Sequence, residues 1–306
     1  MHTSSSQRLT LTRFAWLSIA AAVATILLKL AAYLLTGSVG LLSDAAESLV
    51  NLVGALVALG MLTIAARPPD AQHTFGHSKA EYFSSAIEGL LILSAAAAIA
   101  YTAIERLLNP RPLEQMGIGL LVSTAASLIN LVVAQILIKA GRKYESITLE
   151  ADGKHLMTDV WTSVGVIGGL ALVAFTGWTM LDPIVALLVA VNIVWTAIDL
   201  LRRSVNGLMD ASLPASEQQV IETVMAQYRT RQVEFHALRT RQAASRRFLS
   251  VHMLVPGSWT VHDAHHIAED FERDLRAALG DAIVHTHLEP IEDEISMDDV
   301  NEKPGE

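Results

Sequence analysis

The sequence has 306 residues and contains no cysteine. Disulfide bonds and thiolate ligands are therefore excluded, and any metal must be bound by histidine, carboxylate, amide, backbone or water. Charged residues are also scarce, at 17% of the chain, whereas 52% are hydrophobic and the mean hydropathy is +0.40. This composition excludes an ordinary soluble domain and predicts a membrane protein with the lipid bilayer as its partner. The net charge of −9 is concentrated after Glu289, and we predict no nucleic-acid partner.

Six stretches are long and apolar enough to cross a hydrocarbon core of about 30 Å, which requires roughly 20 helical residues each. We place these spans at 14–36, 38–66, 79–108, 116–140, 147–176 and 181–203. Arg67 and Lys143 follow the second and fourth spans, and Arg203 closes the sixth. The positive-inside rule then predicts that both termini are cytoplasmic. The polar first residues predict no cleaved signal peptide, and we expect a bacterial inner membrane protein.

The last hundred residues or so are more charged, and no window from Gln218 onward is apolar enough to span a membrane. Their patterns predict the element order helix, strand, strand, helix, strand. The expected bounds are 216–228, 235–242, 248–255, 263–279 and 282–288. The fold class is therefore predicted as six transmembrane helices followed by a small α/β domain of the order α-β-β-α-β.

Two of the spans carry polar side chains at the same spacing. Glu47 and Asn51 lie one helical turn apart in the second span, as His155 and Asp159 do in the fifth. Acids inside a membrane span are costly and usually mark ion or substrate paths. The two pairs together offer four N/O ligands, the number that a tetrahedral divalent cation takes. The alternative is that each polar group only ties helices together, which explains one such residue more readily than two matched pairs.

Further polar residues accompany these pairs. Asp44 and Asp152 each precede a pair by one turn, and we predict that Asp152 lies on the cytoplasmic approach and Asp44 on the outer exit. A local cap or helix contact explains either acid equally well. Single polar residues in the spans more often join helices than move ions, so we do not expect the following to be ligands: Lys29, Glu88, Asn130, Asn192 and Asp199.

Potential ligands also gather outside the spans. Asp70, His73 and His77 lie within eight residues of one loop, where they can converge on one ion, although loop histidines are commonly just solvated. Seven of the eleven histidines lie beyond residue 230. His285 and His287 share one face of a predicted strand because side chains alternate.

Three sequence motifs together resemble the cation diffusion facilitator family of metal efflux transporters. They are GSVGLLSDAAESLVN at 37–51, FGHSKAE at 75–81 and ADGKHLMTD at 151–159. The resemblance covers nearly the whole chain. It implies a homodimer that exports divalent transition metals in exchange for protons, by alternating access around a site between the second and fifth spans. His155 and Asp159 match the family's HxxxD, but Asn51 stands where the family usually has Asp.

The resemblance also implies roles for residues outside the spans. It strengthens the loop site, and it implies an ion pair between Lys79 and Asp210. It further implies a cytoplasmic metal cluster that joins two protomers, formed by His236, His252, His265, His287 and Glu289. Three other histidines have no clear counterpart in the family and are interpreted as surface residues, namely His262, His266 and His285.

The chain is thus predicted to divide into four segments. These are a cytoplasmic N-terminal segment at 1–13, a transmembrane domain at 14–207, a cytoplasmic metal-binding and dimerisation domain at 208–290, and an acidic disordered tail at 291–306.

The predicted function is proton-coupled efflux of divalent metal cations, with zinc first and iron, cobalt, nickel or manganese as alternatives. No enzymatic activity is predicted. One alternative is a membrane-embedded metal-dependent hydrolase, although HExxH is absent. The other is a metal-sensing scaffold without transport.

Overall fold

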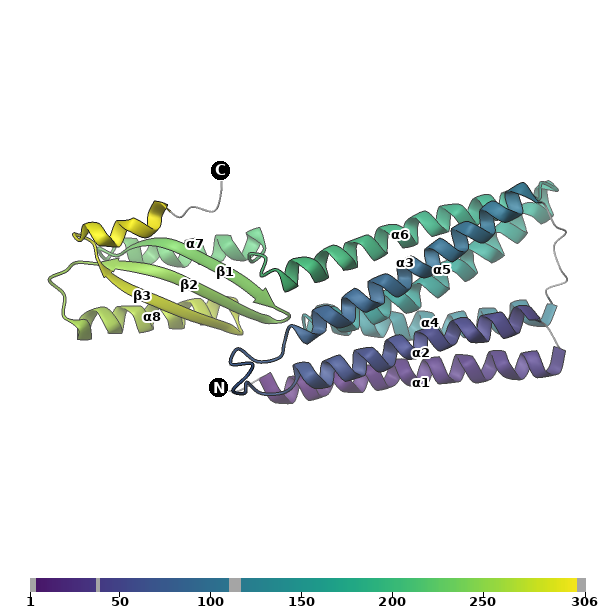
Figure 1. The fold of residues 1–306 in the computed structure, drawn as a ribbon, viewed down its shortest axis with the longest axis horizontal. Coiled ribbons are helices and arrows are strands. Elements are labelled where there is room, and N and C mark those ends of the chain that lie inside the picture. Colours follow the sequence, from purple (N-terminus) through teal and green to yellow (C-terminus); the bar gives the residue numbers. More distant parts are fainter. Residues whose placement is uncertain (1–3, 37–38, 110–116, 302–306) are drawn as a thin grey trace. The chain divides into compact units, whose positions relative to one another are not determined.

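The computed structural model describes residues 4–36, 39–109 and 117–301 (Figure 1). The chain divides into two compact units, Met1–Val205 and Asn206–Glu306. Separate clusters of buried hydrophobic side chains stabilise them: two lie among the helices of the first unit and one lies in the second. Each unit therefore has a core of its own.

The first unit is helical, and each of its six helices is long and apolar enough to cross a membrane. The helices are α1 (Ser4–Thr36), α2 (Val39–Ala65), α3 (Ala80–Leu108), α4 (Gly117–Lys143), α5 (Ile147–Thr176) and α6 (Leu181–Leu208). This confirms the six predicted spans. α1 begins at Ser4, inside the segment predicted to precede the first span, because no proline or glycine interrupts the helix there.

Helix α5 occupies the central position in the first unit. It contacts α1, α2, α3 and α4, and Arg203 of α6 forms a bidentate pair with Glu150 of α5 at 2.8 and 2.9 Å. The start of α5 is capped by Ser146, whose Oγ accepts a hydrogen bond from the backbone N–H of Leu149 and donates one to Glu81 of α3. Polar side chains along α5 can therefore meet groups from several other helices.

The second unit contains α7 (Ala215–Arg229), β1 (Glu234–Ala243), β2 (Arg246–Val255), α8 (Val261–Leu279) and β3 (Ala282–Pro290). The strands form one sheet in the order β1-β2-β3, with β1 antiparallel and β3 parallel to β2. The predicted α-β-β-α-β order is confirmed. β3 can run parallel to β2 because α8 lies between them and returns the chain to the edge of the sheet where β2 begins.

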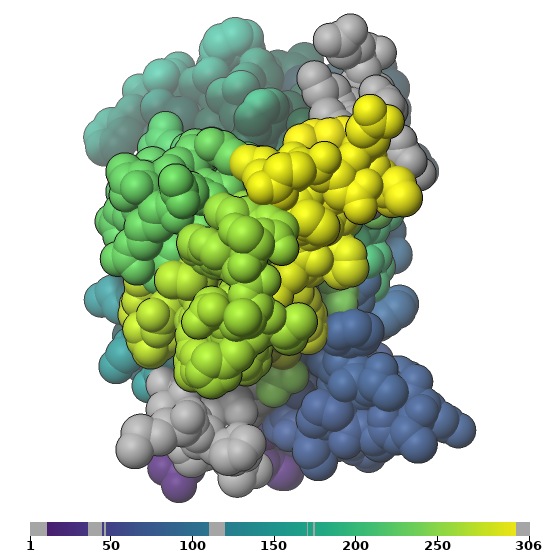
Figure 2. All heavy atoms as spheres, turned by 90° about the vertical axis from the view of Figure 1, so that its left-hand side faces the viewer, coloured from purple at the N-terminus to yellow at the C-terminus, as the bar shows by residue number. Residues whose placement is uncertain are grey.

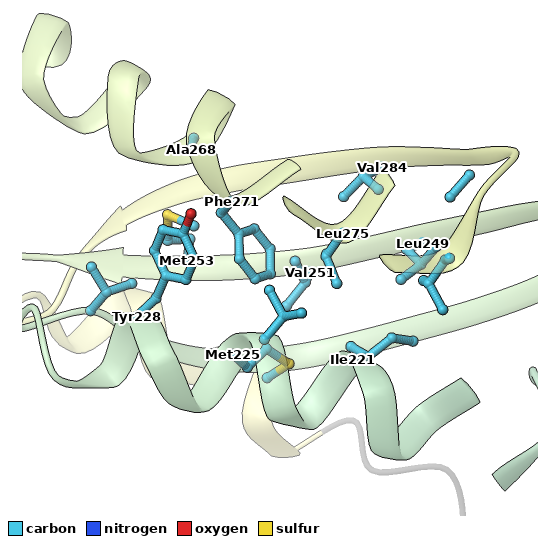
Figure 3. Close-up of a cluster of buried hydrophobic side chains, with 14 of the residues drawn as sticks. Ile221, Met225, Tyr228, Leu249, Val251, Met253, Ala268, Phe271, Leu275 and Val284 are labelled. Carbon is cyan, nitrogen blue, oxygen red and sulfur yellow. The ribbon is translucent and has the colours of Figure 1, made fainter. Parts of the chain in front are cut away.

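Both helices of the second unit pack on one face of its sheet (Figure 3). Phe271 of α8 and Tyr228 of α7 are fully buried and meet edge to face, with ring centroids 5.3 Å apart. Val251 and Met253 of β2 point into the same core. Because side chains alternate along a strand, His252 between them points to the opposite face.

The residues after β3 include a short 3-10 helix, η1 (Glu294–Asn301), where the sequence predicted a disordered tail. Glu292 accepts a hydrogen bond from the backbone N–H of Gly257 at 2.8 Å, and Ser296 Oγ donates one to the Pro290 carbonyl at 2.8 Å. These contacts hold the segment against the second unit, where Figure 2 shows it in yellow on the surface.

Candidate metal sites

Three polar side chains, one each from α2, α4 and α5, meet inside the first unit. The carboxylate of Asp159 on α5 accepts hydrogen bonds from Asn51 Nδ2 of α2 at 2.5 Å and from Asn130 Nδ2 of α4 at 2.9 Å. Asn51 and Asn130 are each only 4% exposed. The structure thus brings together two of the four predicted intramembrane ligands, Asn51 and Asp159, and adds Asn130 to them.

His155 lies one turn before Asp159 on α5 and is buried. Its Nδ1 is 2.5 Å from Oε2 of Glu88, an acid of α3 that is fully buried. The environment of the fourth predicted ligand is different, because the Glu47 side chain is exposed. Within the described residues, the groups of three His, Asp or Glu side chains with ligand atoms within 4.8 Å of one another lie in the loop after α2 and in the second unit, and they include none of Glu47, His155 and Asp159.

Glu88 and Asn130 therefore contact the predicted site residues, although we did not expect them to be ligands. The signal that could have identified Glu88 is a single carboxylate in the middle of an apolar span, which is rare and usually functional. Two of the other single polar residues do join helices: Lys29 donates to Ser48 at 3.0 Å, and Asp199 pairs with Lys154 at 3.0 Å.

The two predicted pathway acids differ in what the structure describes. Asp152 is buried, and its Oδ1 accepts a hydrogen bond from Ser18 of α1 at 3.0 Å. This contact agrees with the alternative of a helix partner, and the pathway role of Asp152 stays a prediction. The side chain of Asp44 lies outside the described residues.

The loop after α2 holds its three predicted ligands together. Asp70 Oδ2 is 3.3 Å from His77 Nε2, and Asp70 Oδ1 is 3.4 Å from His73 Nδ1. Asp70 also accepts the backbone N–H groups of His73 and Gln72, and the first of these hydrogen bonds lowers the pKa of Asp70. A carboxylate with a lowered pKa beside two imidazoles is a donor set that fits a divalent cation such as zinc.

The ion pair predicted between Lys79 and Asp210 joins residues of different units and stays a prediction. Within the second unit, Asp210 contacts Arg241 Nη1 at 3.2 Å. Arg241 therefore offers Asp210 a cationic partner that the sequence did not indicate.

Strand pairing builds the cluster of the second unit. The register of the sheet places His236 opposite His252, and His252 opposite His287. Glu289 follows on the same face of β3 as His287. Its Oε2 is 2.7 Å from His236 Nε2, and its Oε1 is 3.0 Å from His252 Nδ1 and 3.5 Å from His287 Nε2. Three imidazoles around one carboxylate fit a transition-metal ion.

His265, the fifth residue predicted for this cluster, lies elsewhere. It is exposed on α8, which packs on the sheet face opposite to His252, and its ring is 6.1 Å from that of His266. The neighbouring pair His262 and His266 has ring centroids 4.4 Å apart. Within one chain, the structure thus joins four of the five predicted cluster residues.

Two family models match the chain in succession. The cation efflux transmembrane domain matches residues 15–209, and the cytoplasmic domain of cation efflux proteins matches residues 213–291. The chain belongs to the cation diffusion facilitator family of metal efflux transporters. It is therefore a multi-pass membrane protein of a family of cation efflux transporters.

Two relatives with transporter names agree with this membership. The chain is 52% identical over 291 residues to the "Uncharacterized transporter sll1263" of Synechocystis sp., covering 95% of this chain and 94% of the relative. It is 31% identical over 275 residues to the cation-efflux pump FieF of Shewanella oneidensis, covering 90% of this chain and 92% of FieF. A solved structure of CzrB in its zinc form is 33% identical, covers 26% of this chain and 91% of CzrB, and has a TM-score of 0.25.

Proposed function

We propose that this cation efflux transporter exports zinc from the cytoplasm in exchange for protons. The observation that carries the proposal is the contact between Asn51 and Asp159, which joins α2 to α5 inside the membrane-spanning unit at 2.5 Å. Once the Asn51 amide turns so that its Oδ1 faces Asp159, a cation between the two side chains would meet a carboxylate and an amide oxygen, with the imidazole of His155 one turn away.

Proton exchange follows from the chemistry of these ligands. A bound dication favours deprotonated side chains, and protons compete for the same lone pairs. Asn51 offers a neutral carbonyl oxygen that does not take up a proton. Glu47, His155 and Asp159 are then the titratable ligands, and we assign the main proton-carrying role to Glu47 and His155. Alternating access exposes this site first to the cytoplasm, past Asp152, and then to the outside, past Asp44.

Zinc is the preferred cargo because tetrahedral coordination by nitrogen and oxygen suits it. Iron, cobalt, nickel and manganese are the alternative cargoes. At most N/O sites the affinities of these divalent metals follow the same Irving–Williams order, so affinity by itself does not select one of them. The proposal includes metal ions at the loop site of Asp70, His73 and His77 and at the cluster around Glu289, supported by ligand atoms within 4.8 Å of one another at both places.

We further place the protein in the inner membrane with both termini in the cytoplasm. Basic residues at the ends of α2, α4 and α6 support this orientation. The segments 14–207 and 208–290 then act as transport domain and cytoplasmic dimerisation domain of a homodimer, with Lys79 and Asp210 as an ion pair between the two domains.

Reconstitution into vesicles tests the proposal. The purified protein is incorporated with a metal-sensitive dye inside, a pH gradient is imposed, and five divalent cations are compared: Zn²⁺, Fe²⁺, Co²⁺, Ni²⁺ and Mn²⁺. We expect gradient-driven uptake, fastest for Zn²⁺. Uptake that is equally fast without a gradient would contradict proton coupling, and a faster rate for another cation would contradict the choice of zinc.

A further inference from the structure

Glu88 occupies an unusual position in the membrane-spanning unit. It is a carboxylate in the interior of α3, it is fully buried, and its Oε2 lies 2.5 Å from Nδ1 of His155. A buried carboxylate is costly in a membrane span unless another group stabilises it. Here the stabilising group is the imidazole of His155, which we assign to the transport site.

We propose that Glu88 is a positioning residue that orients His155 for the transported cation. This inference rests on the proposed function of the site. A neutral imidazole carries one N–H, and the carboxylate at Nδ1 holds that proton there. The Nε2 lone pair is then available to the metal. Histidine ligands usually donate their other N–H to a carboxylate in this way, which fixes the ring and raises its basicity.

The charge of the site supports the same role. Asn51 provides a neutral amide, so α2 brings no negative charge to the contact with Asp159. Glu88 returns a negative charge to the same region through His155, from a different helix. A dication would thus meet Asp159 directly and Glu88 through the imidazole.

The backbone of α2 leaves space for this carboxylate at Gly54. A Cβ atom built at Gly54 would lie 2.5 Å from Oε1 and 3.0 Å from Oε2 of Glu88. A side chain at residue 54 would therefore force the Glu88 carboxylate out of the position in which it contacts His155. At Gly60, on the same helix, a Cβ atom would meet nothing within 4 Å. Gly54→Ala thus disturbs Glu88 without changing any polar group, and Gly60→Ala is its matched control.

The test is the concentration dependence of transport in vesicles, measured for Zn²⁺ and for Fe²⁺, Co²⁺, Ni²⁺ and Mn²⁺ with the full-length protein. Transport kinetics report on the transport site alone, whereas equilibrium binding would also count the loop site and the histidine cluster. We expect Glu88→Gln to raise KM by about 10- to 100-fold, the usual cost of losing such a partner of a metal-bound histidine. Gly54→Ala should raise KM in the same direction, and Gly60→Ala should behave as wild type.

A purely structural contact between α3 and α5 predicts a different result. Glutamine keeps the size of the side chain and an oxygen that can accept from Nδ1, so a structural role would lower thermal stability and leave KM unchanged. An unchanged KM in Glu88→Gln would overturn the inference even if Gly54→Ala failed to fold. Asp159→Ala distinguishes failure of the inference from failure of the proposed function. Transport by Asp159→Ala would overturn both the proposed function and the inference. Loss of transport in Asp159→Ala, together with an unchanged KM in Glu88→Gln, would overturn the inference alone.

Discussion

At the scale of single residues, Asp159 is the acidic centre of the proposed transport site. It accepts hydrogen bonds from the amides of Asn51 and Asn130 at 2.5 and 2.9 Å. Both of these donors are neutral, so they solvate the negative charge of Asp159 without cancelling it. A carboxyl group in a membrane interior is most stable when a cation lies beside its carboxylate or when it is protonated and neutral. Exchange of a metal cation for protons therefore suits the surroundings of this carboxylate.

The identity of residue 51 should affect proton coupling. Asn51→Asp would place a second carboxylate beside Asp159, and two carboxylates at this distance share a proton or a cation because both cannot remain charged alone. We expect more protons exchanged per metal ion and a changed order of preference among the cations. The measurement is the ratio of proton to metal flux in vesicles that carry a pH dye and a metal dye.

Asn192→Asp is the control for this prediction, since it adds a carboxylate to a different span, α6. The same proton-to-metal ratio and the same metal preference in Asn51→Asp as in wild type would show that the asparagine has no part in selectivity or coupling.

The sequence predicted the pairs on the second and fifth spans and, through the family resemblance, that the two pairs face each other. The spacing of His155 and Asp159 places them on one face, because a helix repeats every 3.6 residues. Which side chains of other helices face them depends on helix packing, and neither Glu88 nor Asn130 has a His, Asp, Glu or Asn three or four residues away in its own span. These two contacts required the structure.

At the scale of elements, strand register explains the histidine cluster. Alternation along β3 predicts that His287 and Glu289 share a face, but the sequence does not specify the parallel register that places His287 opposite His252. The element order was predictable because its strands and helices differ in hydrophobic period. The position of His265 was not, since it depends on which face of the sheet α8 covers.

The start of α8 offers a stability test in the second unit. Thr260 is the N-cap of this helix, and its Oγ1 accepts a hydrogen bond from the backbone N–H of Asp263 at 3.2 Å. Thr260→Ala removes that acceptor and should destabilise the unit by about 1 kcal/mol. Hydrogen exchange of the α8 amides in the full-length protein measures the change.

Thr260→Ser keeps the hydroxyl and is the matched control for the cap. Equal protection of the α8 amides in the alanine and serine variants would show that the hydrogen bond from Thr260 does not stabilise the helix.

At the scale of the whole molecule, the proposed homodimer depends on metal at the cluster around Glu289. Removal of metal by a chelator, or His252→Ala, should weaken the dimer by at least about tenfold, which corresponds to about 1.4 kcal/mol. Light scattering across a dilution series measures the dimer dissociation constant. His285→Ala is the control, because His285 is exposed on β3 and is interpreted as a surface residue. A dimer that resists both the chelator and His252→Ala would contradict the metal-dependent assembly.

The central claim is that one site around Asp159 carries the metal and couples it to protons. Its most direct test is simultaneous recording of metal and proton flux in vesicles for wild type, Asp159→Ala and Asp199→Asn. Asp199 is the control acid, since it pairs with Lys154 on the membrane-spanning unit at 3.0 Å. We predict opposite metal and proton fluxes in wild type and Asp199→Asn, and neither flux in Asp159→Ala. Metal flux without proton counterflow in wild type, or undiminished flux in Asp159→Ala, would contradict the account.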